Sequence, residues 1–137
     1  MGGLRLKKDS YLFDTHALIF WSNKESVSDD YIIFFDKQEQ KGNIFVSSIS
    51  FWEIALLVKK GKIEITDIHA WKNEILNNTN IELIDPTASE MIDSTLLPDH
   101  HKDPFDRLLI AQAYRHQLLL VTKDIDIQKY SIQTFWI

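Results

Sequence analysis

The chain has 137 residues, of which 45% are hydrophobic and 26% are charged, and its formal net charge is −5. This length fits one domain of ordinary size rather than two, and the acidic balance excludes a broad cationic surface for nucleic acid. The lack of cysteine excludes disulfides, thiolate nucleophiles and cysteine-based metal sites. The longest apolar runs, YIIFF and LLLV, are far shorter than the roughly 20 residues of a membrane span, so we expect a cytoplasmic protein with no membrane partner.

Apolar runs and turn signals predict that short strands alternate with helices. Residues 1–9 are a polar lead-in to a single domain over residues 10–137. Strands are predicted at 11–13, 44–47, 81–84 and 118–122, with a fifth within 134–137. Helices are predicted at 15–23, within 26–42, from 48 to about 61, at about 67–78, at 87–97 and at 104–117. This pattern indicates a three-layer α/β/α fold around a central, mainly parallel sheet of four to five strands.

Four acidic residues follow a predicted strand or open a predicted helix, namely Asp14, Glu53, Asp106 and Asp124. In a parallel sheet, strand ends and the starts of the following helices share one edge, and ligands bind there. Carboxylates from distant parts of the sequence are therefore predicted to converge at that edge.

Each acid also has a structural interpretation as a helix cap or turn residue. These interpretations are an N-cap at Asp14, a capping box from Ser50 to Glu53, an N-cap at Asp103 with Pro104 ahead of Asp106, and a turn at Asp124 and Asp126. Helical spacing nevertheless aligns Glu53 and Asp106 with the apolar side of their own helices, where a carboxylate needs a partner.

A cluster of carboxylates requires a compensating positive charge. Two unit charges about 4 Å apart repel by roughly 4 kcal/mol at an effective dielectric constant of 20. Oxygen ligands of this kind select Mg²⁺ or Mn²⁺, which can polarise a phosphodiester and activate a water molecule for in-line attack. The cluster therefore predicts metal-dependent hydrolysis of a nucleic-acid backbone.

Three segments, together nearly half of the chain, carry a family resemblance: LFDTHALIFW (12–21), VSSISFWEIALLVKKGKIEI (46–65) and LPDHHKDPFDRLLIAQAYRHQLLLVTKD (97–124). They resemble the PIN-domain ribonucleases, specifically the VapC-type toxins of bacterial type II toxin–antitoxin modules. DPFDRLLIAQA is the specific signal, whereas DTHA alone is weak. The polar start MGGLRLKK is a departure from the family pattern and does not touch these segments.

The resemblance implies a PIN fold and an Mg²⁺- or Mn²⁺-dependent endoribonuclease that acts on an RNA substrate. It also implies a homodimer and a cognate antitoxin protein that occupies the acidic pocket. By position, Asp14, Glu53, Asp106 and Asp124 match the four family acids. Asp14 and Asp106 are expected to bind the metal directly, Glu53 directly or through water, and Asp124 through water.

Other polar and aromatic residues near these acids have two interpretations each. Thr15 and Ser47 either orient ligands through their hydroxyl groups or cap helices. His100 and His101 form a separate metal site with nearby acids or, as we expect, pack in a loop and hydrogen-bond the next helix start. The aromatic residues Phe20, Trp21, Phe51 and Trp52 are expected in the core or in a dimer interface rather than as platforms for bases. Lys59, Lys60 and Lys62 are either a local basic cluster or ordinary surface lysines.

Two functions of other classes compete with the nuclease. The first is a catalytically silent PIN-like module whose acidic pocket binds a basic peptide; the retention of all four acids disfavours it. The second is a phosphoacceptor receiver-like domain, with Asp14 near the first strand and Asp85 at the end of the third. That fold also requires a lysine after the fifth strand, and the chain has none there.

Overall fold

The computed structural model describes residues 9–137, and residues 1–8 of the predicted lead-in lie outside the described residues. Within the described part, five strands form one sheet in the order β3-β2-β1-β4-β5, and every neighbouring pair is parallel. The strands are β1 (Tyr11–Phe13), β2 (Ile44–Ser47), β3 (Glu82–Ile84), β4 (Leu119–Val121) and β5 (Thr134–Phe135). The predicted fifth strand is therefore confirmed.

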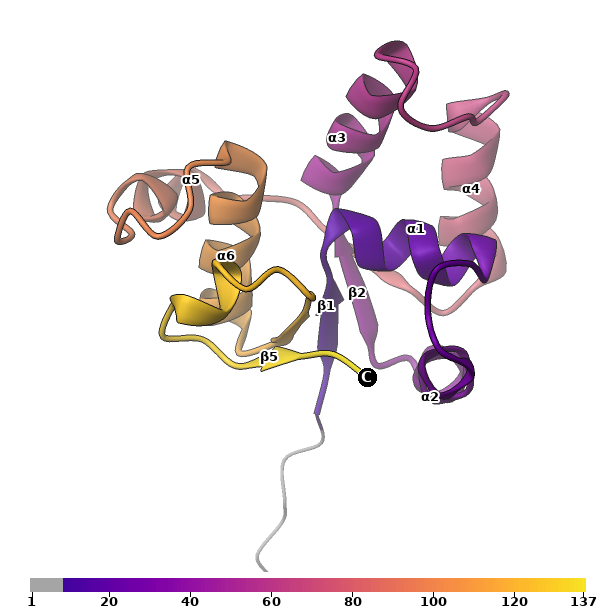
Figure 1. The fold of residues 1–137 in the computed structure, drawn as a ribbon, viewed down its shortest axis with the longest axis horizontal. Helices are drawn as coiled ribbons and strands as arrows, with labels where there is room; N and C mark the ends of the chain where they lie inside the picture. Colours follow the sequence, from indigo (N-terminus) through magenta and orange to yellow (C-terminus); the bar gives the residue numbers. More distant parts are fainter. Residues whose placement is uncertain (1–8) are drawn as a thin grey trace, which may run out of the picture.

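Helices cover both faces of this sheet. They are α1 (Thr15–Asn23), α2 (Asp29–Gln40), α3 (Ser48–Lys59), α4 (Ile68–Asn78), α5 (Ala88–Thr95), α6 (Pro104–His116) and the short 3₁₀ helix η1 (Ile127–Lys129). Figure 1 shows α5 and α6 on one side of the strands, α1, α2 and α4 on the other, and α3 rising beyond the end of β2. Within residues 9–137, no helix combines the length and apolar character that crossing a membrane requires.

The core residues of the central strand show why the fold has three layers. Tyr11 and Phe13 lie in the hydrophobic cluster on the side of α1, α2 and α4, whereas Leu12, between them, lies in the cluster on the side of α6. Successive side chains of a strand point to opposite faces, so an all-apolar strand needs helices on both sides. The predicted α/β/α arrangement is confirmed. At the edge of the sheet the prediction of buried strands is wrong, because Leu83 in β3 is 42% exposed.

Helix starts follow the expected capping chemistry at most positions. The Ser47 hydroxyl caps α3 by accepting from the backbone N–H of Ile49 (3.2 Å), and Asp103 caps α6 directly ahead of Pro104. The predicted capping box from Ser50 to Glu53 is wrong. The chain turns into α3 already at Ser47, so Ser50 is a buried residue inside the helix.

Candidate functional site

The central strands place the first acid and the fourth near each other. In the β1–β4 pair, Phe13 lies opposite Val121, and the backbone N–H of Asp14 donates to the Val121 carbonyl (3.1 Å). The side chain of Thr122, the next residue, hydrogen-bonds the Asp14 carboxylate. Asp124 follows two residues later, at the same edge of the sheet.

Asp14 is a buried carboxylate, with 7% of its surface exposed. Its Oδ1 accepts from the backbone N–H of Ala17 (2.7 Å), so the predicted cap of α1 is present. Burial raises the pKa of Asp14 above its ordinary value, although hydrogen bonds from Ala17 and Thr122 and the nearby His16 oppose this shift, and Glu53 adds to it. Capping therefore does not remove the electrostatic cost of placing this carboxylate inside the protein.

Glu53 reaches the same region from α3. The hydroxyl of Thr15, the residue after Asp14, donates to Glu53 Oε1 (2.6 Å) and also hydrogen-bonds the Ser50 hydroxyl (3.1 Å). Thr15 and Ser50 are both buried. The hydroxyl of Thr15 thus orients the second acid, which is one of the two roles considered for it.

Asp106 projects from the first turn of α6 toward the other acids. Its pKa is raised to about 8, chiefly by burial and also by the negative charges of neighbouring acids, which are, in order of effect, Asp103, Glu53, Asp14 and Asp124. Three of these four charges belong to the predicted set. Glu53, Asp14 and Asp124, from three other segments of the chain, therefore lie within electrostatic range of Asp106.

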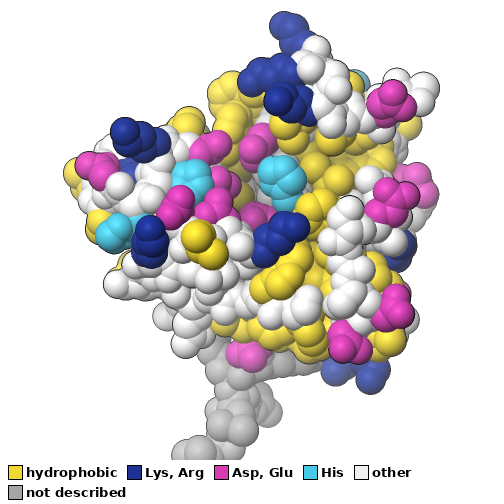
Figure 2. Space-filling view, in the orientation of Figure 1, with side chains coloured by type: hydrophobic (Ala, Val, Ile, Leu, Met, Phe, Trp, Pro, Cys, Tyr) yellow, Lys and Arg dark blue, Asp and Glu magenta, His cyan; other side chains and the backbone are white. Residues whose placement is uncertain are grey.

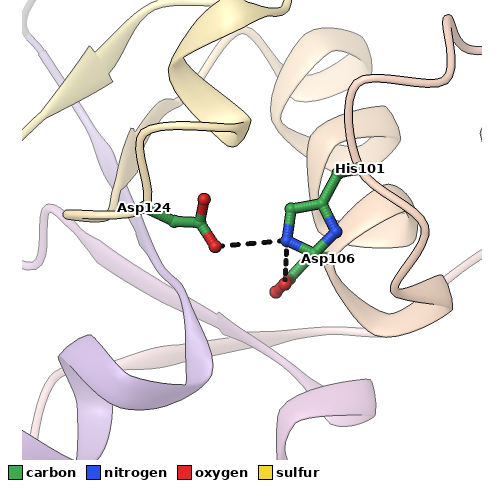
Figure 3. A group of neighbouring side chains, drawn as sticks. All are labelled: His101, Asp106 and Asp124. Atoms are coloured by element: carbon green, nitrogen blue, oxygen red, sulfur yellow. Dashed lines mark hydrogen bonds and ion pairs between the residues drawn. The ribbon is translucent and has the colours of Figure 1, made fainter.

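His101 lies between Asp106 and Asp124, as Figure 3 shows. Its Nε2 is 3.1 Å from Oδ2 of each carboxylate. Its Nδ1 accepts from the backbone N–H of Asp103 (3.0 Å), so Nδ1 carries a lone pair and the proton of the neutral ring is on Nε2. His101 is therefore a hydrogen-bond donor to the two acids.

Asp124 divides its two oxygens between a turn and the acidic cluster. Oδ1 accepts from the backbone N–H groups of Asp126 (2.8 Å) and Ile127 (3.3 Å), while Oδ2 faces His101. Partial burial raises the pKa of Asp124, but the hydrogen bonds from Asp126, His101 and Ile127 outweigh this effect, and the pKa lies below its ordinary value. This turn confirms the structural interpretation of Asp124, and the residue still presents an oxygen to the cluster.

Arg107 fixes the loop that carries His101. Its guanidinium donates to the carbonyls of Ser94 (3.1 Å), Leu97 (2.8 Å), Pro98 (3.1 Å) and His101 (2.9 Å), and its side chain is 12% exposed. The Tyr130 hydroxyl accepts from the His101 backbone N–H (2.9 Å) and donates to the Pro98 carbonyl (2.6 Å). The position of the imidazole thus depends on α6 and on the chain after η1.

The donor atoms of this cluster suit a hard divalent cation. Figure 2 shows Asp and Glu side chains gathered at the centre of one face, with histidines on either side. Ligand atoms of His101, Asp106 and Asp124 lie within 4.8 Å of one another, and Asp14 and Glu53 adjoin them. Since Nε2 of His101 carries a proton, the carboxylate oxygens are the groups available to a cation. Oxygen donors of this kind fit Mg²⁺ or Mn²⁺.

The sequence predicted one of the two contacts that His101 makes. The expected hydrogen bond at the helix start is confirmed, but the contact of Nε2 with the two acids was missed. His100 packs its ring against Tyr130 (5.1 Å between centroids), as expected for a loop residue. Trp21 lies in the core as expected, whereas Trp52 is largely exposed, so the core alternative is excluded for it and the dimer-interface alternative stays a prediction.

Comparison with known proteins places this fold and acidic cluster in a family. The model of the PIN domain matches residues 11–133, so the chain belongs to the PIN-domain family, as its sequence motifs predicted. The chain is 28% identical to ribonuclease VapC22 of Mycobacterium tuberculosis over 118 residues. The aligned part covers 82% of this chain and 85% of that protein.

Two solved structures share the fold at low sequence identity. DNA-bound VapBC from Salmonella typhimurium has a TM-score of 0.70 and 15% identity over 93% of this chain and 98% of that chain. VapBC2 from Rickettsia felis, bound to a DNA fragment from its promoter, has a TM-score of 0.67 and 21% identity over 90% of this chain and 95% of that chain. These similarities confirm the expected α/β architecture.

Proposed function

We propose that this protein is the toxin of a type II toxin–antitoxin module and that it hydrolyses RNA phosphodiesters with Mg²⁺ or Mn²⁺. The observation that carries the proposal is the convergence of carboxylates from four segments of the chain around Asp106, whose raised pKa is a consequence of burial among them. A cluster that disfavours its own ionisation is poised to bind a cation. Membership of the PIN-domain family and the similarity to ribonuclease VapC22 support the same activity.

The four acids and their neighbours have distinct roles in this proposal. Asp14 and Asp106 hold the ion, with Glu53 oriented by Thr15 and Asp124 oriented by His101. A bound divalent ion would polarise the phosphodiester and lower the pKa of the attacking water. The hydroxyl of Thr15 and the imidazole of His101 keep the carboxylates aimed at the ion, which reduces the reorganisation needed during the reaction.

An antitoxin is the protein partner of this proposal. Solved structures with the same fold include VapBC assemblies and a toxin–antitoxin complex from Klebsiella pneumoniae. A basic segment of the antitoxin would neutralise the acidic cluster and block the substrate. The homodimer expected from the resemblance is also part of the proposal.

Cleavage of a labelled, structured RNA tests the activity. We expect cleavage with Mg²⁺ or Mn²⁺, none with chelator, and a loss of at least 100-fold in Asp14→Ala and Asp106→Ala, since these variants lose ligand oxygens. Asp126→Asn is the matched control, because Asp126 is an acid of the same loop as Asp124 but pairs with Lys129. Undiminished cleavage in both alanine variants would reject the assignment.

Thermal melting separates a nuclease from a silent binding module. A bound ion stabilises the folded state by about 2.7 kcal/mol at a hundredfold excess over its dissociation constant. We expect Mn²⁺ to raise the melting temperature of the wild type but not of Asp14→Ala. A protein that binds a basic peptide, shows no metal-dependent melting and does not cleave RNA would be the silent module instead.

A further inference from the structure

Trp52 lies beside the acidic cluster with most of its side chain in solvent. It is 60% exposed and is the most exposed tryptophan in residues 9–137. An indole buries a large area when a partner covers it, and tryptophan is therefore frequent in interfaces. The surroundings of Trp52 indicate which kind of partner it suits.

The Trp52 ring packs against Phe105 across the gap between α3 and α6. The ring centroids are 5.2 Å apart and the planes meet at 79°, an edge-to-face arrangement. Trp52 directly precedes Glu53, and Phe105 directly precedes Asp106. The ring pair therefore lies beside the acidic cluster, and the contact with Phe105 supports one edge of the indole.

We propose that Trp52, supported by Phe105, is a stacking platform for one base of a single-stranded RNA whose phosphodiester lies at the acidic cluster. This inference rests on the proposed ribonuclease function and adds a substrate-binding residue to it. Unpaired bases stack on aromatic rings whatever their identity, because every base has a π-face. A platform next to the cleavage site would hold the strand without selecting a base.

The charge of the protein explains why such a platform is needed. Proteins that bind nucleic acid usually gain affinity from many phosphate contacts with Lys and Arg, but this chain has a net charge of −5. An uncharged contact must then supply part of the affinity. Lys59 lies seven residues after Trp52 on the same face of α3, about 10 Å along the helix, and is exposed. Figure 2 shows Lys and Arg side chains gathered at the top of this view. A cation at the end of α3 can contact the phosphate backbone of an RNA that leaves the acidic cluster past Trp52.

RNA affinity measured by fluorescence anisotropy tests the platform. The probe is a short, labelled, single-stranded RNA, and all variants carry Asp106→Asn to prevent cleavage. We expect Trp52→Ala to weaken binding about 5- to 150-fold, which corresponds to the roughly 1–3 kcal/mol of one base–aromatic stack. Trp52→Phe should stay within about threefold of the parent, and an abasic nucleotide at the stacked position should abolish the difference between Trp52 and alanine.

Tyr114→Ala is the matched control, because Tyr114 is 73% exposed and lies on α6 away from the acids. It should leave RNA affinity unchanged. The proposal is overturned when Trp52→Ala retains its melting temperature and its RNA affinity. It is equally overturned when Trp52→Ala changes only the molecular mass in solution or only the affinity for a basic peptide, since Trp52 then contacts a second copy or an antitoxin.

The two proposals fail in different measurements. Absence of metal-dependent cleavage by the wild type rejects the ribonuclease function, whatever Trp52 does. Cleavage by the wild type with unchanged KM and kcat in Trp52→Ala rejects the platform alone. A base-stacking role predicts a raised KM with a smaller change in kcat, because the contact is made in the bound substrate as well as in the transition state.

Discussion

The Thr15 hydroxyl donates a 2.6 Å hydrogen bond to Glu53, which lies 38 residues later on another helix. Thr15→Val keeps the shape of the side chain but removes this donor. We expect the free energy of unfolding to fall by about 1–2 kcal/mol, because a partly buried hydrogen bond to a carboxylate is lost. We also expect the cleavage rate to fall about tenfold, because Glu53 is no longer held toward the other acids. Urea denaturation measures the stability and single-turnover cleavage measures the rate. Thr15→Ser should keep both near the wild-type values, because serine retains the hydroxyl donor. Wild-type stability and rate in Thr15→Val would show that Glu53 needs no positioning.

The adjacent histidines allow a matched comparison. His101 donates to Asp106 and Asp124 through Nε2, whereas His100 only packs against Tyr130. We expect His101→Ala to lower the cleavage rate at least tenfold and His100→Ala to change it less than twofold. Titration calorimetry with Mn²⁺ should show weaker binding in His101→Ala alone, since the two carboxylates lose their common donor. Equal effects of the two substitutions would mean that the imidazole of His101 only fills space.

Two arginines of α6 differ in what their guanidinium groups contact. Arg107 donates to four backbone carbonyls, whereas Arg115 makes an exposed pair with Asp93. Arg107→Lys retains the charge but not the planar guanidinium, so it cannot donate to all four carbonyls. We expect the free energy of unfolding to fall by about 3 kcal/mol. Arg115→Lys should show no measurable loss. Urea denaturation compares the two, and similar stabilities would indicate that the loop before α6 does not depend on Arg107.

The pKa of Asp106 makes the stability of the metal-free protein depend on pH. The carboxyl titrates at about 8 in the folded protein and at an ordinary acidic pKa when unfolded, so the folded state holds the proton more tightly. The stability that this group contributes is therefore lost as the pH rises from about 4 to about 8. We expect Asp106→Asn to stabilise the metal-free protein by on the order of 2–3 kcal/mol at pH 9 and least near pH 4. Thermal melting in chelator across this range checks the sign, and a pH-independent difference would contradict the raised pKa.

Local patterns were enough to predict the sheet and the region where the acids meet. The strand around Leu12 is wholly apolar, which requires helices on both faces and hence a parallel sheet. Parallel strands end at one edge, so Asp14 and Asp124 had to lie near each other. These predictions depend on short-range patterns and on topology alone.

Predictions that depend on side-chain direction were less successful. The sequence from Ser50 to Glu53 fits a capping box, but the N-cap of α3 lies three residues earlier at Ser47, so the motif lies inside the helix. The direction of the His101 ring depends on Arg107 and on Tyr130, which is 29 residues away. Helical spacing left Trp52 either in the core or in a dimer interface, because spacing does not show that α3 extends beyond the end of β2 and leaves this side chain exposed.

The order of the strands has a consequence for translation. β4 lies between β1 and β5, so the central strand β1 gains its second neighbour only after the fourth strand has been synthesised. A nascent chain that has made only β1, β2 and β3 carries Asp14 and Glu53 but lacks β4, the neighbour of β1, and Asp124. The cluster of Asp14, Glu53, Asp106 and Asp124 is therefore completed only after the chain has been synthesised through Asp124.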